Sequence, residues 1–263
     1  MRTRTSWVWW VRALVCAGLL SLSPLSRARA DELNVAVAAN FLGTLQRLAP
    51  LFEKATGHKL LPSPGSSGQI YAQIQRGAPY DVFLSADSER PAQLEAEGLA
   101  VKGSRFTYAI GRLVLWSPKP GVVDAQGEVL KKRELGFVSL ADPKTAPYGA
   151  AAEQALTGLK LLAPLRAANK LVYGESIAQA QQFVSSGHAQ LGFVALSQIT
   201  DEQGQLMGSH WLVPEALYKR LDQDAVVLSA STKQALAQQF LKWLRTDAKA
   251  VALVRASGYA LPK

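Results

Sequence analysis

The sequence contains one cysteine, Cys16, in 263 residues. A lone cysteine excludes an internal disulfide and a cysteine-based zinc site. Histidine is also scarce, with His58, His188 and His210 lying far apart along the chain. No HExxH pattern, P-loop or complete GxGxxG motif occurs. The common signatures of metal-dependent hydrolysis and of nucleotide binding are therefore missing.

Acidic residues are missing from the first thirty positions, which carry five arginines. The apolar run ALVCAGLLSL follows Arg12, and Ala28-Arg29-Ala30 forms a small-x-small pattern before Asp31. A run of about ten apolar residues is half of the roughly 20 that a bilayer span needs. We interpret residues 1–30 as a secretory signal peptide, with an uncleaved membrane anchor as the alternative. Its removal leaves 24 basic and 20 acidic residues, a net charge of +4, and no cysteine.

A dense basic cluster is absent from the remaining 233 residues as well. The longest basic run is KKR at 131–133, which is typical of a solvated surface. Nucleic-acid-binding domains concentrate positive charge on one face, and this chain shows no such concentration. We therefore expect no nucleic-acid partner.

Short apolar runs alternate with amphipathic segments in the first part of the chain. Strands are predicted at 33–39, 58–63 and 81–86 and helices at 41–56, 70–76 and 91–97. Asn40 is predicted to be the N-cap of the first helix, and Pro50 to kink or split it. This β-α alternation is typical of a parallel sheet covered by helices on both faces.

The pattern changes after a long predicted strand at 106–117 and a turn or hinge at 118–121. A second α/β unit follows, with strands at 135–141 and 191–196 and helices at 149–158 and 176–186; a strand at 225–230 then returns to the first unit, and helices at 232–245 and 247–256 end the chain. We predict an α/β fold of two lobes, each a mixed sheet flanked by helices. Lobe 1 comprises 31–112 and 225–263, lobe 2 is the inserted 113–224, and two crossover segments join them. Binding clefts favour such interfaces.

Four places share one form, in which a small or polar residue leads into a helix. They are Ala39-Asn40, Ser66-Ser67-Gly68, Pro147-Tyr148-Gly149 and Ser176-Ile177. Helix N-termini carry unpaired N–H groups and a partial positive charge, so several of them directed at one point would bind an anion. Each place taken alone is also explained by an ordinary helix cap, because Ser176 with Gln179 matches a capping box.

The two serines in PGSSGQI raise the question of a nucleophile. A nucleophilic serine needs a base within hydrogen-bond reach, and none of the three histidines is placed to provide one. The stretch also fails the G-x-S-x-G pattern, because Gly68 directly follows Ser67. Turns and caps account for Asp81, Asp87 and Asp142. We therefore expect hydrogen-bond donors and no catalytic residue, with a serine hydrolase as a minor alternative.

Several motifs in this order resemble the periplasmic molybdate-binding proteins of molybdate ABC importers. They are AVAANF, GSSGQIYAQIQRGAPYDVFLSAD, ADPKTAPYG and LGFVALSQI, which are spread over nearly the whole chain after residue 30. The chain is similar to the form of this family with Asn at the first motif position, here Asn40, and with Tyr in the PYG turn, here Tyr148. It has Ala195 where other relatives carry a ligand tyrosine.

The resemblance implies a type 2 periplasmic binding protein, a periplasmic location, an inner-membrane ABC permease as partner, and a monomer. It implies molybdate or tungstate as the ligand, so that molybdenum enters only within the bound oxyanion and no cofactor is needed. Its motif positions place ligand contacts at Asn40, Ser67, Tyr148 and Ile177, with Ala39 and Ser66 as further neighbours. Another tetrahedral oxyanion, sulfate or phosphate, is the alternative ligand.

Overall fold

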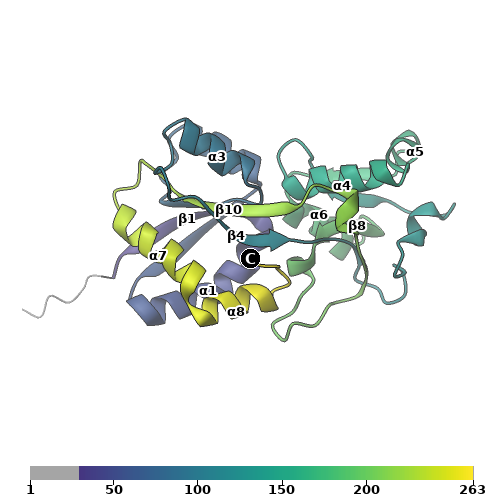
Figure 1. The fold of residues 1–263 in the computed structure, drawn as a ribbon. Helices are drawn as coiled ribbons and strands as arrows, with labels where there is room; N and C mark the ends of the chain where they lie inside the picture. Colours follow the sequence, from purple (N-terminus) through teal and green to yellow (C-terminus); the bar gives the residue numbers. More distant parts are fainter. Residues whose placement is uncertain (1–29, 263) are drawn as a thin grey trace, which may run out of the picture.

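The computed structural model describes residues 30–262, which form two five-stranded sheets (Figure 1). The first sheet has the order β2-β1-β3-β10-β4. Its strands are β1 (Glu32–Ala38), β2 (Lys59–Gly65), β3 (Val82–Leu84), β4 (Phe106–Gly111) and β10 (Leu221–Val227). β1 runs parallel to β2 and β3, while β10 runs antiparallel to β3 and β4. The sheet is therefore mixed, as predicted.

The second sheet has the order β7-β6-β8-β5-β9. Its strands are β5 (Leu113–Ser117), β6 (Val138–Ala141), β7 (Leu171–Gly174), β8 (Leu191–Ala195) and β9 (Ser209–Leu212). β6 is parallel to both β7 and β8, whereas β5 is antiparallel to β8 and β9. We call the part built on the first sheet lobe 1 and the part built on the second sheet lobe 2.

Helices cover both sheets (Figure 1). Lobe 1 has α1 (Leu42–Thr56), α2 (Ser67–Gln75), α3 (Glu89–Ala96), α7 (Gln234–Thr246) and α8 (Ala248–Ala256), and lobe 2 has α4 (Pro147–Gly158), α5 (Leu162–Ala167) and α6 (Ile177–Ser185). The strand β1 has helices on both of its faces, because successive side chains of a strand point to opposite faces of the sheet. Val35 and Val37 pack in the core beneath α1 and α7, whereas Ala36 packs in the core beneath α2 and α3.

The chain crosses between the sheets at Arg112 and again between β9 and β10. The single strand predicted over 106–117 is wrong: β4 ends at Gly111 in the first sheet, and β5 starts at Leu113 in the second. The first crossing therefore comes before the turn at 118–121. The returning strand begins at Leu221, four residues before the predicted 225.

One local prediction for the first helix is wrong, and of the kink or split predicted at Pro50, the split does not occur. Asn40 is not the N-cap of α1, because it lies in a short 3-10 turn, η1 (Ala39–Phe41), and makes no capping bond. Pro50 does not split α1, which is continuous around it. Proline removes the hydrogen bond to the carbonyl four residues earlier, that of Gln46. Both Gln46 and Pro50 are exposed, so water can reach that carbonyl.

The described helices include none with the length and apolar character that crossing a membrane requires. The predicted signal peptide lies outside the described residues except for Ala30, which is exposed.

Candidate functional site

One small cavity lies where the two lobes meet, and all six residues expected at the binding site line it. These residues are Ala39, Asn40, Ser66, Ser67, Tyr148 and Ile177. The cavity volume is about 10 Å³, on the order of the room that one water molecule needs. This space excludes an extended ligand, and even a five-atom anion would have to widen it.

Three helices begin at this cavity. Ser67 is the first residue of α2, Tyr148 the second residue of α4, and Ile177 the first residue of α6. N–H groups in a first helical turn have no carbonyl partner within their own helix. The hydrogen bonds of residues 30–262 include none from the N–H groups of these three residues. Three backbone donors from both lobes are thus available at the cavity.

The two serines of the first loop have different tasks. Ser66 is the N-cap of α2, and with Gln69 it forms a capping box. The Oγ of Ser67 accepts a hydrogen bond from the N–H of Ala86, with an N···O distance of 2.9 Å. Because a hydroxyl that accepts one bond keeps its own hydrogen, Ser67 is left with a donor. Both hydroxyls therefore keep a hydrogen to donate, and Ser66 differs from Ser67 in that it caps α2.

Asn40 belongs to a buried polar network behind the cavity. Its Nδ2 donates to the Oε1 of Gln223 and to the hydroxyl of Tyr259, both at 3.0 Å. The Nε2 of Gln223 donates to the hydroxyl of Tyr148, also at 3.0 Å. Within the described chain, the Oδ1 of Asn40 is buried without a partner. The site therefore contains both free donors and one orphaned acceptor.

Burial keeps the aromatic hydroxyls of this network neutral. The side chain of Tyr148 is 1% exposed, and its burial raises its pKa well above the usual value. The pKa of Tyr108, which bonds the same Gln223 at 3.1 Å, is raised for the same reason. Both phenols stay protonated at any physiological pH and can serve only as neutral hydrogen-bonding groups.

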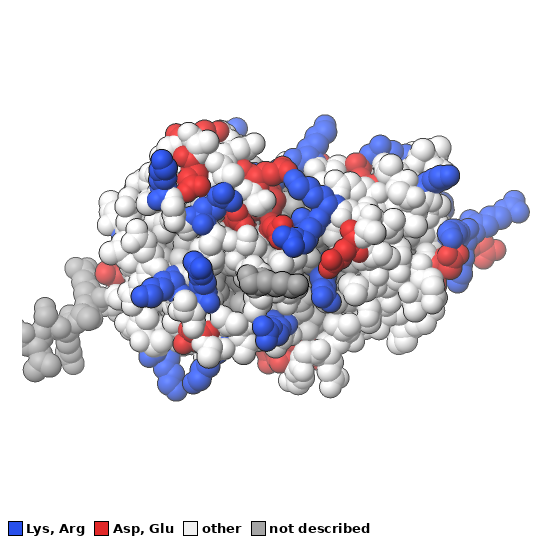
Figure 2. All heavy atoms as spheres, in the orientation of Figure 1, with Lys and Arg blue, Asp and Glu red and all other residues white. Residues whose placement is uncertain are grey.

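Charged side chains are absent among the residues that line the cavity in the described part of the chain. They gather instead in a neighbouring groove of about 290 Å³, which shares Ala86 and Pro147 with the cavity. Three ion pairs lie there: Arg90 with Asp87, Lys219 with Glu89, and Arg220 with Asp222. Figure 2 shows basic and acidic side chains mixed over the middle of this face. The hydrogen bond from Lys219 lowers the pKa of Glu89.

Direct contacts hold the two lobes together around the cavity. The N–H of Gly68 donates to the carbonyl of Thr145 across the interface, at 2.9 Å. A Cβ on Gly68 would lie 2.9 Å from the Cα of Thr145, so only glycine permits this approach. The hydroxyl of Ser197 donates to the carbonyl of Asn40 at 3.0 Å. The structure is therefore a closed form in which the lobes touch.

Several residues of the site were not foreseen from the sequence. Ala86 follows β3, Ala146 precedes α4, and both line the cavity. Gln223 lies on β10 and is 0% exposed. In LDQDAVV it stands between two aspartates and shares a strand face with Leu221 and Ala225, but nothing local reveals its partners.

Two mixed α/β lobes, two crossings and a small donor-lined cavity between the lobes define a solute-binding protein. The chain belongs to the bacterial extracellular solute-binding proteins, whose family model matches residues 33–260. This result confirms the family-level interpretation of the sequence motifs and the predicted two-lobed fold.

Two relatives and one solved structure illustrate the similarity. The chain is 51% identical over 245 residues to the molybdate-binding protein ModA of Azotobacter vinelandii, covering 93% of this chain and 94% of that protein. It is 47% identical over 232 residues to the protein of the same name from Rhodobacter capsulatus, covering 88% and 89%. The solved structure of the Azotobacter vinelandii periplasmic molybdate-binding protein matches with a TM-score of 0.86 at 49% identity, covering 88% of this chain and 100% of that one.

Proposed function

We propose that this protein binds molybdate or tungstate in the periplasm and delivers the anion to an inner-membrane ABC permease. The observation that carries this proposal is the donor-lined cavity between the lobes, to which each lobe contributes. Its support from the comparisons is the 51% identity to a molybdate-binding protein. Asn40, Ser67, Tyr148 and Ile177 are the proposed ligand residues, with Ala39 and Ser66 as neighbours.

Neutral donors suit a transported dianion. Bonds from N–H and O–H groups to a charged oxygen are stronger than bonds between neutral groups, so a few of them replace much of the hydration shell. The partial positive charge at the starts of α2, α4 and α6 adds to this attraction. A direct salt bridge would make release slower. The lining therefore favours tight but reversible binding.

The position of the cavity links binding to closure. An anion that contacts α2 of lobe 1 together with α4 and α6 of lobe 2 has its full set of partners only when the lobes are together. Such a ligand shifts the population toward the closed form by its differential affinity. The closed form is the signal that we propose the permease recognises. We expect the protein to act as a monomer, since the two lobes of a single chain form the whole cavity.

The two alternatives differ in chemistry. Sulfate and phosphate are tetrahedral as well, so they would use the same donors. Their bonds to oxygen are shorter than those of molybdate and tungstate, so the fit of the anion to the cavity decides between the two pairs of ligands. A serine hydrolase would need a base beside Ser66 or Ser67. No histidine lines the cavity in the described chain, and both serine hydroxyls are already bonded to backbone N–H groups. We therefore propose a binding protein rather than an enzyme.

Thermal and calorimetric titration tests the proposal. Molybdate at about 1,000 times its dissociation constant should stabilise the folded protein by about 4 kcal/mol, and tungstate should do the same. Sulfate and phosphate at equal concentration should produce a much smaller shift and should not displace molybdate. An unchanged melting temperature with molybdate and tungstate would contradict the oxyanion assignment. Displacement by sulfate at equal concentration would favour the alternative ligand.

A further inference from the structure

Gln223 connects the two halves of the site. It lies on β10, the strand by which the chain returns to lobe 1, and its side chain is fully buried. One end of its amide contacts Asn40 of lobe 1, and the other contacts Tyr148 of lobe 2. The partners are separated from it by 183 and 75 residues in sequence. A single amide thus touches two of the proposed ligand residues, one from each lobe.

The hydrogen-bond pattern in the closed structure does not suit an anion. Asn40 uses its Nδ2 for Gln223 and Tyr259, which leaves its Oδ1 buried and unpaired at a residue that lines the cavity. An amide oxygen can only accept, and so can every oxygen of a fully ionised oxyanion. An unpaired buried acceptor is costly in the empty protein and repels the proposed ligand.

A second pattern satisfies the network. The terminal torsions of Asn and Gln are roughly two-fold, so each amide can turn by half a circle and exchange its oxygen and nitrogen. If both turn, the nitrogen of Gln223 donates to Asn40 and to Tyr108, which lie 3.0 and 3.1 Å from its present oxygen. Its oxygen then accepts from the hydroxyl of Tyr148, which lies 3.0 Å from its present nitrogen.

The remaining partners are already in place for this pattern. The hydroxyl of Tyr259 donates to the Asn40 carbonyl at 2.8 Å in the closed structure. It can turn this hydrogen to the turned Asn40 side chain, because Ser197 also donates to the same carbonyl, at 3.0 Å. Tyr108 can donate to the carbonyl of Ser85 at 3.0 Å while it accepts from Gln223. The turned Asn40 then has its two N–H donors free in place of the orphaned oxygen.

We propose that Gln223 is a positioning residue that determines which group donates to the anion. In the bound state the amides of Gln223 and Asn40 turn together, and Asn40 donates through Nδ2. Tyr148 then uses its hydroxyl for Gln223 and contributes its backbone N–H to the anion. This inference rests on the proposed oxyanion-binding function, and it assigns a role to a residue that no motif marks.

Calorimetry with molybdate on four variants tests the assignment. Gln223→Leu removes the amide at similar volume and should weaken binding about 10- to 100-fold, the effect of leaving Asn40 without its partner. Asn40→Leu should weaken binding about 100-fold and Tyr148→Phe by less than tenfold. Gln46→Leu is the matched control, because Gln46 is exposed on α1 in the groove beside Asn40 and, among the described residues, makes no hydrogen bond to Gln223.

Side-chain amide NMR provides a reading that does not depend on stability. The signals of both Asn40 and Gln223 should shift when molybdate is added, while the signal of Gln46 stays in place. If Gln223→Leu unfolds the protein, Gln223→Glu takes its place: an acceptor-only carboxylate holds the Asn40 nitrogen away from the anion, so the loss should exceed 100-fold.

The outcomes separate this inference from the proposed function. A parent protein that binds no oxyanion overturns both. A parent that binds molybdate while Gln223→Leu binds within threefold of it overturns the inference alone. A larger loss for Tyr148→Phe than for Asn40→Leu also overturns it, because the phenol would then be the donor. The inference is supported if the amide signals of Asn40 and Gln223 both shift and Asn40→Leu loses more affinity than Tyr148→Phe.

Discussion

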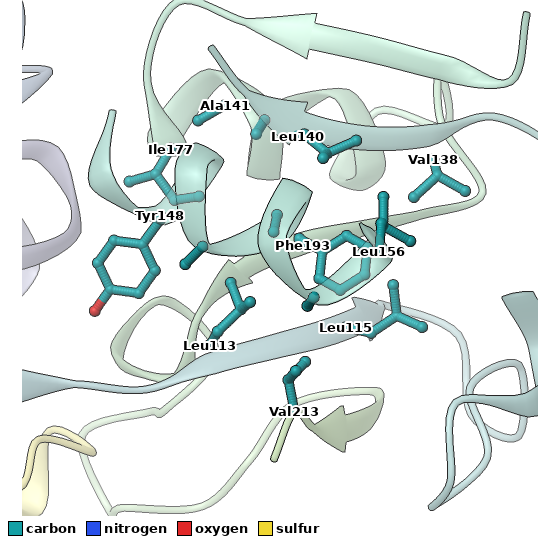
Figure 3. Close-up of a cluster of buried hydrophobic side chains, with 14 of the residues drawn as sticks. Leu113, Leu115, Val138, Leu140, Ala141, Tyr148, Leu156, Ile177, Phe193 and Val213 are labelled. Atoms are coloured by element: carbon teal, nitrogen blue, oxygen red, sulfur yellow. The ribbon is translucent and has the colours of Figure 1, made fainter. Parts of the chain in front are cut away.

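The two lobes build their halves of the cavity in different ways. Lobe 1 contributes side chains in addition to the backbone N–H of Ser67, since Ser67 and Asn40 bring polar groups that hydrogen bonds hold in place. Lobe 2 contributes backbone, since the N–H groups of Tyr148 and Ile177 lie at the starts of α4 and α6. Figure 3 shows the side chains of Tyr148 and Ile177 among the buried apolar residues of lobe 2.

The difference teaches where substitutions should matter. In lobe 1 the chemistry lies in the side chains, so replacing one removes a donor. In lobe 2 the side chains pack in the core and the donors belong to the main chain, so an apolar exchange keeps the donor. The same anion would therefore respond strongly to side-chain changes in one lobe and weakly in the other.

A large effect, comparable to that of Asn40→Leu, is expected for Ser67→Ala in lobe 1. The change removes the free hydroxyl donor, and a hydrogen bond to a charged group contributes about 1.5–3 kcal/mol, so molybdate affinity should fall about 10- to 150-fold. The Ala86 N–H also loses its acceptor, which should lower the free energy of unfolding by about 1 kcal/mol. Calorimetry and denaturant unfolding measure the two effects. Parental affinity in this variant would show that Ser67 only supports the loop.

A smaller effect is expected where the lobes touch. Gly68→Ala places a methyl group 2.9 Å from the Cα of Thr145 and should keep the lobes slightly apart, weakening molybdate binding about tenfold. The ligand-free protein should be as stable as the parent, because alanine favours the helical conformation that Gly68 adopts in α2.

Gly43→Ala serves as the control for this substitution. Gly43 is also helical and lies near the site in α1, but a Cβ there would meet nothing within 4 Å. Its affinity for molybdate should equal that of the parent. Small-angle scattering with molybdate should show a more open Gly68→Ala protein; a fully closed one with weaker binding would mean that the interlobe contact has another role.

The smallest effect is expected for the Ile177 side chain. Ile177→Val keeps the N–H and should change affinity by less than about threefold, while the lost methylene lowers the free energy of unfolding by about 0.5–1.5 kcal/mol. Ile177→Pro removes the N–H itself, and proline is accepted at the first position of a helix. The extended backbone of Ser176, with φ −142° and ψ 166°, also suits a following proline.

Ile177→Val and Ile177→Pro therefore separate the contribution of the side chain from that of the backbone N–H in lobe 2. Calorimetry should show that Ile177→Pro binds molybdate at least about tenfold more weakly than Ile177→Val, because a backbone donor to a charged oxygen is lost. Equal affinities would place the ligand away from the start of α6.

The sequence predicted the two-sheet architecture well because local patterns encode it. Buried strands such as β1 appear as apolar runs, and helix starts carry small polar residues. The crossing at Arg112 was not predictable, because FTYAIGRLVLWS is strand-forming throughout and sheet membership depends on tertiary pairing. A Cβ at Gly111 would lie 2.1 Å from the Tyr148 hydroxyl, which explains the glycine only after the fold is known.

The residues that gather at the cavity were likewise indicated by motif, but their roles were not. Ser66 and Ser67 are equivalent in sequence, and only their neighbours make Ser66 the cap of α2 and bring the hydroxyl of Ser67 to the N–H of Ala86. Asn40 was misassigned as a cap because its partners Gln223 and Tyr259 lie 183 and 219 residues away. Long-range hydrogen bonds leave no local pattern.

The small volume of the cavity has a kinetic consequence. An anion bound between the lobes would keep its full set of partners only while the lobes touch, as they do at Gly68 and Thr145. Its residence time is then limited by how often the protein opens, whatever the strength of the individual bonds. A transporter that binds the closed protein would shorten that time by separating the lobes, without competing for the anion itself.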